Sequence, residues 1–166
     1  MNQVQDCQLV SAQVGALPIV NRILDRLTLP ALLTAALGTG DPRVKLPGAA
    51  AVRLVVTNLV LGREPLYALG EWAARYDPAL LGLSPAQVGA VNDDRVGRVL
   101  EELFYADRAS LATAVVLRAI KEFAVDTTQL HNDSTSITLH GNYAGATGTS
   151  GDEPTPAVIT PGHSKD

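Results

Sequence analysis

The sequence of 166 residues predicts a mainly α-helical protein, with a helical N-terminal domain over residues 1–125 and an incomplete second domain over residues 126–166. Hydrophobic residues make up 46% of the chain and charged residues 18%, which is enough apolar content for a packed core. Aromatic residues contribute only 4%, so alanine and leucine carry the apolar content and favour helices over a β-sandwich. Charge separates the two parts, because residues 1–125 hold 12 basic and 12 acidic residues whereas residues 126–166 hold 1 and 5.

Prolines, glycines and capping residues divide the first part into about six helices with short breaks. A short helix over residues 31–37 is bracketed by Pro30 and Gly38, and Ser84 followed by Pro85 is typical of a helix start. The helix that Pro65 opens is predicted to continue to Tyr76. Six predicted helices begin near Pro18, Ala31, Pro47, Pro65, Asn92 and Arg108, and Ser84-Pro85 marks a further predicted start.

The last two helices of the first part have the clearest periodicity. Asn92 is predicted to cap the first of them, and the second is predicted to span residues 108–123. The apolar stripe of the first helix consists of Val96, Val99, Leu100 and Leu103. The predicted apolar face of the second helix consists of Ala112, Val116, Ala119, Ile120 and Phe123.

After Phe123 the helical period ends and β-branched and hydroxyl-bearing residues follow. Residues 130–139 are predicted to form one long strand, or two strands bent at residues 134–136, and residues 157–161 a further strand. The Gly- and Thr-rich residues 141–156 are predicted to form a loop. Two strands cannot enclose a core, so this part is interpreted as the start of a second domain.

Polar motifs are concentrated in this second part. An aspartate, Asp133, lies inside the predicted strand, between His131-Asn132 and Ser134-Thr135-Ser136. Aspartate is depleted in strands, and binding of a metal ion is one reason for its presence there. The motifs Gly141-Asn142-Tyr143 and Gly162-His163-Ser164-Lys165-Asp166 follow.

This order of motifs resembles bacterial insertion-sequence transposases of the DDE class. In that family a helical N-terminal domain precedes an RNase H-like α/β catalytic domain, whose first strand carries the first catalytic aspartate in an Asp-(Thr/Ser)-Thr-Ser context. Residues 133–136 match that context, residues 141–143 match the Gly-x-Tyr that follows it, and residues 162–166 match a later Gly-(His/Tyr)-Ser-Lys-Asp run. Residues 92–100 are also similar to the helical segment typical of the family.

The resemblance implies that residues 126–166 are the first strands of a truncated RNase H-like domain and that Asp133 is a catalytic metal ligand. Phosphodiester transfer of this kind uses two divalent ions about 4 Å apart, and Mg²⁺ or Mn²⁺ is the cofactor expected for the complete catalytic domain. The family needs a further aspartate and a glutamate beyond residue 166, so this chain alone is not expected to cleave DNA strands. Asp126, in Asp126-Thr127-Thr128, is the alternative first aspartate.

Three arginines are candidates for contacts to DNA phosphates, namely Arg95, Arg98 and Arg108. The balanced charge of residues 1–125 opposes this interpretation, because it leaves no strong basic surface. The alternative is that Arg95 and Arg98 pair with acidic neighbours on a solvated helix face, namely Asp94, Glu101 and Glu102.

Other candidate residues have simpler interpretations. Arg43 and Lys45 are weaker candidates for DNA contact, and Trp72 and Tyr76 are expected in the core rather than as a platform for base stacking. The remaining candidates are interpreted as solvated or hydrogen-bonded residues rather than metal ligands: His131, His163, Asp152 and Glu153.

The function expected from the resemblance is DNA transposition, a form of DNA recombination, by an N-terminal part of a transposase. The expected partners are the terminal inverted repeats of the element and, as protein partners, a second copy of the chain or an intact transposase. The single cysteine, Cys7, fits a reducing cytoplasm, and neither a secretory signal nor a membrane span is predicted. The alternative is a non-catalytic helical module that binds DNA or another protein.

Overall fold

The computed structural model describes residues 11–41 and 43–129. The chain separates into two units, Met1–Thr127 and Thr128–Asp166, and every helix of the described residues belongs to the first unit. The predicted boundary at residue 125 stays a prediction, because nearly all of the second unit lies outside the described residues. The strands predicted over residues 130–139 and 157–161 lie there as well.

The described part of the chain is mainly helical, as predicted, and contains no strand. One isolated bridge pairs Gln13 with Tyr76. Among the described residues, no helix combines the length and the apolar character needed to cross a membrane. The α-helices and 3-10 helices are α1 (Leu17–Arg26), α2 (Leu29–Leu37), α3 (Gly48–Leu61), η1 (Leu66–Ala68), α4 (Leu69–Ala73), η2 (Pro78–Leu81), α5 (Pro85–Val88), α6 (Asp93–Tyr105) and α7 (Arg108–Phe123).

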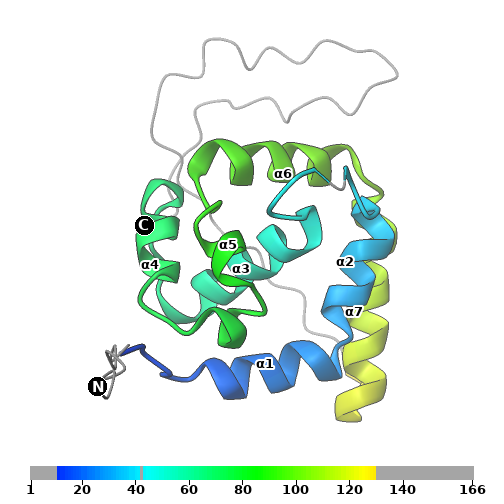
Figure 1. The fold of residues 1–166 in the computed structure, drawn as a ribbon. Coiled ribbons are helices and arrows are strands. Elements are labelled where there is room, and N and C mark those ends of the chain that lie inside the picture. The colour runs from blue at the N-terminus through cyan, green and yellow to red at the C-terminus, as the bar shows by residue number, and fades with distance from the viewer. Residues whose placement is uncertain (1–10, 42, 130–166) are drawn as a thin grey trace, which may run out of the picture. The chain divides into compact units, whose positions relative to one another are not determined.

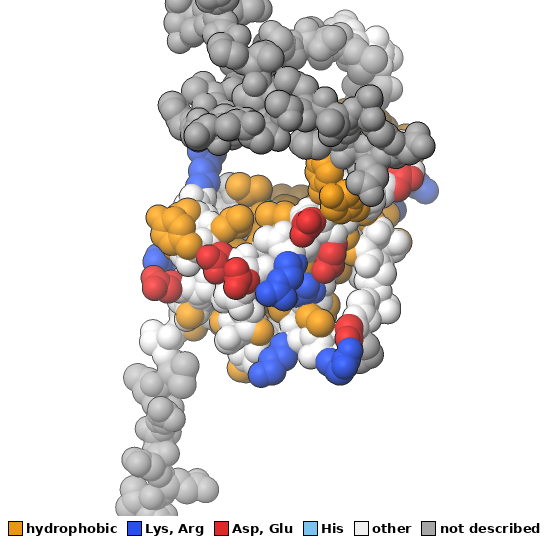
Figure 2. Space-filling model, turned by 90° about the horizontal axis from the view of Figure 1, so that it is seen from above, with side chains coloured by type: hydrophobic (Ala, Val, Ile, Leu, Met, Phe, Trp, Pro, Cys, Tyr) orange, Lys and Arg blue, Asp and Glu red, His pale blue; other side chains and the backbone are white. Residues whose placement is uncertain are grey.

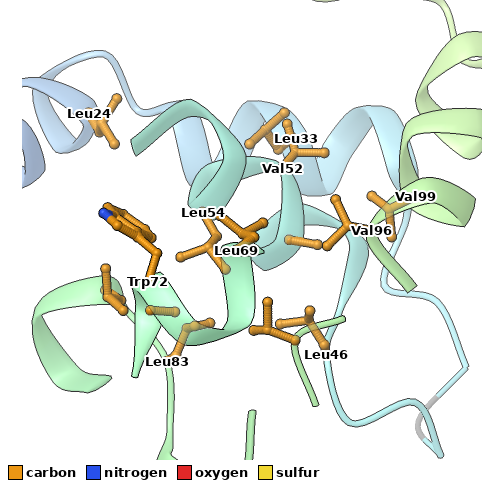
Figure 3. Packing of buried hydrophobic residues seen from close by; sticks show 14 of the residues in the cluster. Leu24, Leu33, Leu46, Val52, Leu54, Leu69, Trp72, Leu83, Val96 and Val99 are labelled. Carbon is orange, nitrogen blue, oxygen red and sulfur yellow. The ribbon is translucent and has the colours of Figure 1, made fainter. Parts of the chain in front are cut away.

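Helix α3 lies in the middle of the domain (Figure 1). Helices α2 and α7 run side by side along one flank, and α6 and α2 both contact α3. The interior is apolar: Leu54 of α3, Leu69 and Trp72 of α4, and Val96 of α6 meet there and are almost fully buried (Figure 3). Packing against this core fixes the position of α6, the helix that carries the candidate residues Arg95 and Arg98.

Local capping explains several helix starts, as predicted. The hydroxyl of Ser84 accepts a hydrogen bond from the Gln87 N–H, and the Gln87 side chain accepts one from the Ser84 N–H, which forms a capping box. Pro30 lies in the first turn of α2, although that helix begins at Leu29 rather than at Ala31. Such caps satisfy N–H groups that the helix itself leaves without a partner.

The single helix predicted from Pro65 to Tyr76 is wrong. The segment is divided into η1 and α4, and α4 ends at Ala73, after which Arg75 and Tyr76 donate to the carbonyl three residues earlier. The start of α4 also lies very close to the segment before α6. A Cβ on Gly70 would lie only 2.8 Å from the Val91 carbonyl oxygen. Periodicity alone does not report such a contact.

The apolar face predicted for α7 is not the face that packs against the core. Ala112 and Val116 are exposed, and α7 packs instead through Leu111 and Val115. No residue of α7 is fully buried. The helix is apolar on more than one side, so its periodicity did not distinguish the packed face from the outer face.

Candidate nucleic-acid interface

The position of α6 is set by its cap and its apolar stripe. The Asn92 side-chain oxygen accepts a hydrogen bond from the Arg95 N–H at 2.8 Å, as the sequence predicts for a cap. Val96 and Val99 are buried, and Leu100 and Leu103 are half-buried against the core. This arrangement directs Arg95 and Arg98 away from the core by different angles.

Arg95 binds within the domain. Its side chain is only 19% exposed, and its Nη1 lies 3.1 Å from Oε1 of Glu102. Its Nε donates to the carbonyl oxygen of Leu46, a buried residue in the loop between α2 and α3, at 3.0 Å. Arg95 therefore joins α6 to that loop, and its Nε and Nη1 donors are used by protein acceptors.

Arg98 is exposed on the opposite side of α6 from the core. Within the described residues it makes no hydrogen bond and no ion pair. Helical spacing places Asp94 and Glu101 one turn to either side of it. Arg98 is free to contact a phosphate, but its immediate surroundings are acidic.

Arg108 begins α7, directly after the two residues that separate it from α6. Its guanidinium carbon lies 4.4 Å from the centre of the Phe104 ring, a cation–π geometry that leaves the side chain exposed. Asp107 caps the helix by accepting from the Ser110 N–H at 3.0 Å. The Ser110 side chain is the main cause that holds the pKa of Asp107 below its ordinary value, and the hydrogen bond from the Ser110 N–H adds to the effect.

The loop before α3 contributes two more cations beside α6. Arg43 pairs with Asp41 at 2.6 Å, and this pair lowers the pKa of Asp41 and raises that of Arg43. Lys45 is exposed, and its neighbour Leu46 receives the hydrogen bond from Arg95. The Arg95 contact therefore brings this loop alongside α6.

Acidic and basic side chains are interspersed over the face of the domain shown in Figure 2. Basic side chains do not form a continuous area on the visible part of that face. Arg98, Lys45 and Arg108 are the exposed cations available for DNA contact, and carboxylates are interspersed among the basic side chains. The electrostatic attraction of this surface to a phosphate backbone would therefore be modest.

An open pocket of about 440 Å³ lies at the start of α6. The residues that line it include Tyr67, Glu71, Ala74, Val88 and Asp93. Its ionisable groups include two carboxylates, which disfavour an anionic ligand such as phosphate.

The predicted catalytic site lies outside the described residues. This holds for Asp133, for His131 and His163, and for both glycine-containing motifs. The alternative aspartate, Asp126, is described and exposed. In the part of the chain that the structure describes, no three His, Cys, Asp or Glu side chains are grouped so that they could hold a metal ion.

Trp72 is buried, as expected, with 2% of its surface exposed, and its ring centre lies 5.1 Å from that of the half-buried Tyr76. A buried ring cannot stack on a base. The feature that sequence reasoning missed is the exposed apolar side of α7, where Val116 is 55% and Leu117 60% exposed. The sequence signal for this surface was the presence of apolar residues on more than one side of that helix.

The described helices define a small all-α domain with scattered exposed cations. Residues 9–117 match the family described as domain of unknown function DUF4277, and the chain belongs to that family. The match covers α1 to α6 and the first part of α7. No curated protein and no solved structure matches the chain.

Proposed function

We propose that this protein is the N-terminal part of an insertion-sequence transposase, and that its helical domain binds DNA at the ends of the element. The observation that carries the proposal is the order of three motifs along one chain: residues 92–100, residues 133–143 and residues 162–166. Each motif is short, but their order is that of DDE transposases.

The geometry of the first motif supports a DNA-binding role for part of it. Asn92 and Arg95 stabilise α6 and its loop, which leaves Arg98 exposed without a protein partner in the described domain. Arg108 and Lys45 add two exposed cations on neighbouring segments. These three side chains are the proposed phosphate contacts, and Arg95 acts by holding their segments together.

The second motif assigns the chemistry proposed for the complete protein. Asp133 would be the first carboxylate ligand of Mg²⁺ or Mn²⁺ in an RNase H-like domain, where the ions would supply the activation of the nucleophile and of the leaving oxygen. The described residues offer no such site, so strand cleavage and transfer are proposed only for a chain with the later carboxylates. The proposed place of action is the cytoplasm, where bacterial DNA is accessible.

Binding of labelled DNA duplexes to the full chain tests this proposal. Fluorescence anisotropy with overlapping duplexes that cover the DNA flanking the gene should find preferred duplexes, whose affinity falls with salt. Arg98→Ala should weaken binding to every duplex similarly and lower the salt slope by about 1, as expected for one lost phosphate contact.

Arg22→Ala is the matched control, because Arg22 is also an exposed helical arginine but lies on α1. Equal effects of the two variants, or no binding to any duplex at low salt, would contradict the proposed interface. Asp133→Ala should leave binding unchanged, and it should abolish strand cleavage once the complete catalytic domain is present.

The second candidate is a non-catalytic helical module that binds DNA or another protein. The exposed apolar side of α7 favours it, since such a surface suits a protein partner better than a phosphate backbone. Under this alternative Asp133→Ala has no effect on function in the complete protein, which separates the two candidates.

A further inference from the structure

We propose that α7 pairs with α7 of a second copy of this chain, antiparallel to it and about a two-fold axis close to Val116. The inference rests on the shape and polarity of the outer face of α7 and does not depend on DNA binding. The outer face is defined by Ala109, Ala112, Val116, Leu117, Ile120 and Phe123.

These residues share one side of the helix and carry no charge. Val116, Leu117 and Phe123 are 55%, 60% and 39% exposed, Ala109 and Ala112 are also exposed, and Ile120 is half-buried. Among the described residues, the guanidinium of Arg26 lies 4.5 Å from the centre of the Phe123 ring, and Val116 and Leu117 stay mostly exposed. A helix with such residues turned to solvent leaves most of this apolar surface uncovered by the described part of the domain.

The opposite side of α7 holds the helix firmly on the domain. Leu111 and Val115 pack against the core. Arg118 donates from Nε to the carbonyl oxygen of Arg26 at 3.0 Å, and Arg26 donates from Nε to Glu122 at 2.9 Å. The outer face is therefore presented on a fixed helix rather than on a loose terminal segment.

The sizes of the side chains favour a second copy as the occupant. The first half of the outer face is small, with Ala109 and Ala112, and the second half is large, with Ile120 and Phe123. An antiparallel pair centred at Val116 sets Phe123 against Ala109 and Ile120 against Ala112, so that each large residue meets a small one. A parallel pair would set large residues against large ones and leave a gap between the alanines.

This arrangement has the symmetry of a closed dimer, in which the same surface of both copies is self-complementary. The 16 residues of α7 extend about 24 Å. One helix pair of that length covers less than the roughly 1,600 Å² typical of a stable interface. We therefore expect a reversible dimer whose population rises with protein concentration.

Cysteine cross-linking of the full chain tests the register. In a Cys7→Ser background, Val116→Cys should form a disulfide with itself, because residue 116 lies at the two-fold axis. A mixture of Ala109→Cys and Phe123→Cys should form a mixed disulfide, whereas neither variant alone should, since each is about 21 Å from its own copy along the helix.

Sedimentation velocity over a range of concentrations tests the association itself. Val116→Lys should weaken the dimer by about tenfold or more, because it places a charge at the centre of an apolar contact. Val60→Lys is the matched control: Val60, on α3, is 61% exposed, close to the 55% of Val116, and its substitution should leave the dimer unchanged. Circular dichroism of both variants checks that the fold is retained.

Three results would overturn the proposal. The chain could remain monomeric at every concentration, or the dimer could respond equally to the two lysine substitutions. A monomer in which Val116→Cys is protected from alkylation would show instead that another segment of the same chain covers the outer face. Loss of DNA binding by the Arg98→Ala variant has no bearing on any of these outcomes.

Discussion

Arg26 and Glu122, which are 96 residues apart in the sequence, form an ion pair with 2.9 Å between Nε and Oε1. Arg118 lies 3.3 Å from the other carboxylate oxygen of Glu122, and the guanidinium of Arg26 also lies over the ring of Phe123 at 4.5 Å. The last helix is thus attached to the first by polar contacts, in addition to the packing of its apolar residues.

Glu122→Gln should make the domain less stable at neutral pH and less sensitive to acid. The hydrogen bond from Arg26 holds the pKa of Glu122 below its ordinary value, and the charges of Arg118, Arg26 and Arg22 lower it further. Because the pKa is lower in the folded state, the carboxylate stabilises the fold above about pH 4.5, and this stabilisation is lost as the pH falls through the folded pKa.

The measurement is the melting temperature of wild type and variant between pH 3 and pH 7. The difference between the two proteins should shrink toward the acid end, where Glu122 is protonated in both states of the wild type. The pKa values of Asp41 and Asp107 are also lowered, but these residues are common to both proteins and do not affect the difference. A difference that is constant with pH would contradict the prediction.

Gly62→Ala and Gly97→Ala should have opposite effects on stability. A Cβ on Gly62 would lie 2.6 Å from Nε1 of the buried Trp72 and 2.9 Å from Oδ1 of Asn58, so alanine there should cost about 1–3 kcal/mol. A Cβ on Gly97, in α6, would meet no atom within 4 Å, so alanine there should stabilise by about 0.5–1 kcal/mol. Urea unfolding, followed by circular dichroism, compares the free energies of unfolding of the two variants. If both substitutions lowered this free energy, the space around Gly97 in α6 would not be open, which would contradict the prediction.

Asn92→Ala should lower the stability of the domain by about 1 kcal/mol, because the first turn of α6 loses the acceptor for the Arg95 N–H. Asn92→Asp keeps an acceptor at the same place and should restore most of the stability. Thermal unfolding of the three proteins measures this order. If alanine and aspartate were equally destabilising, the side-chain cap would not be the reason for the loss.

Arg95→Ala and Arg98→Ala should differ in their effect on folding, although both residues lie on α6. Arg95→Ala removes the donor to the buried Leu46 carbonyl and should cost about 1–2 kcal/mol in the free energy of unfolding. Arg98→Ala should change that free energy by less than about 0.5 kcal/mol, because the side chain is exposed and without a partner in the described domain. Denaturant midpoints compare the two, and similar losses would contradict the separation of a structural from a surface arginine.

Much of the local structure was predictable because its causes lie within a few residues. The cap at Asn92 and the stripe that includes Val96 and Val99 are local patterns, and both are found in α6. Local patterns did not distinguish the structural role of Arg95 from the exposed position of Arg98. Arg95 and Arg98 are three residues apart, but the acceptor that occupies Arg95 is the Leu46 carbonyl, 49 residues away.

The predicted catalytic aspartate shows the other limit. Asp133 is predicted as a metal ligand from its motif alone, and it lies outside the described residues. Its assignment as a metal ligand therefore stays a prediction, as does the assignment of DNA transposition to the complete protein.

The sequence by itself determined that most of the chain between Leu17 and Phe123 is helical, because capping residues, prolines and apolar periods act over one or two turns. The tertiary structure decided where those helices end, as in the division of residues 65–76, and which side of α7 packs. Both decisions depend on atoms distant in the chain: the Val91 carbonyl lies against Gly70, and Arg26 bonds Glu122. A helix that is apolar on two sides has no local preference for burying either one, so its long-range contacts determine which face is left for a partner.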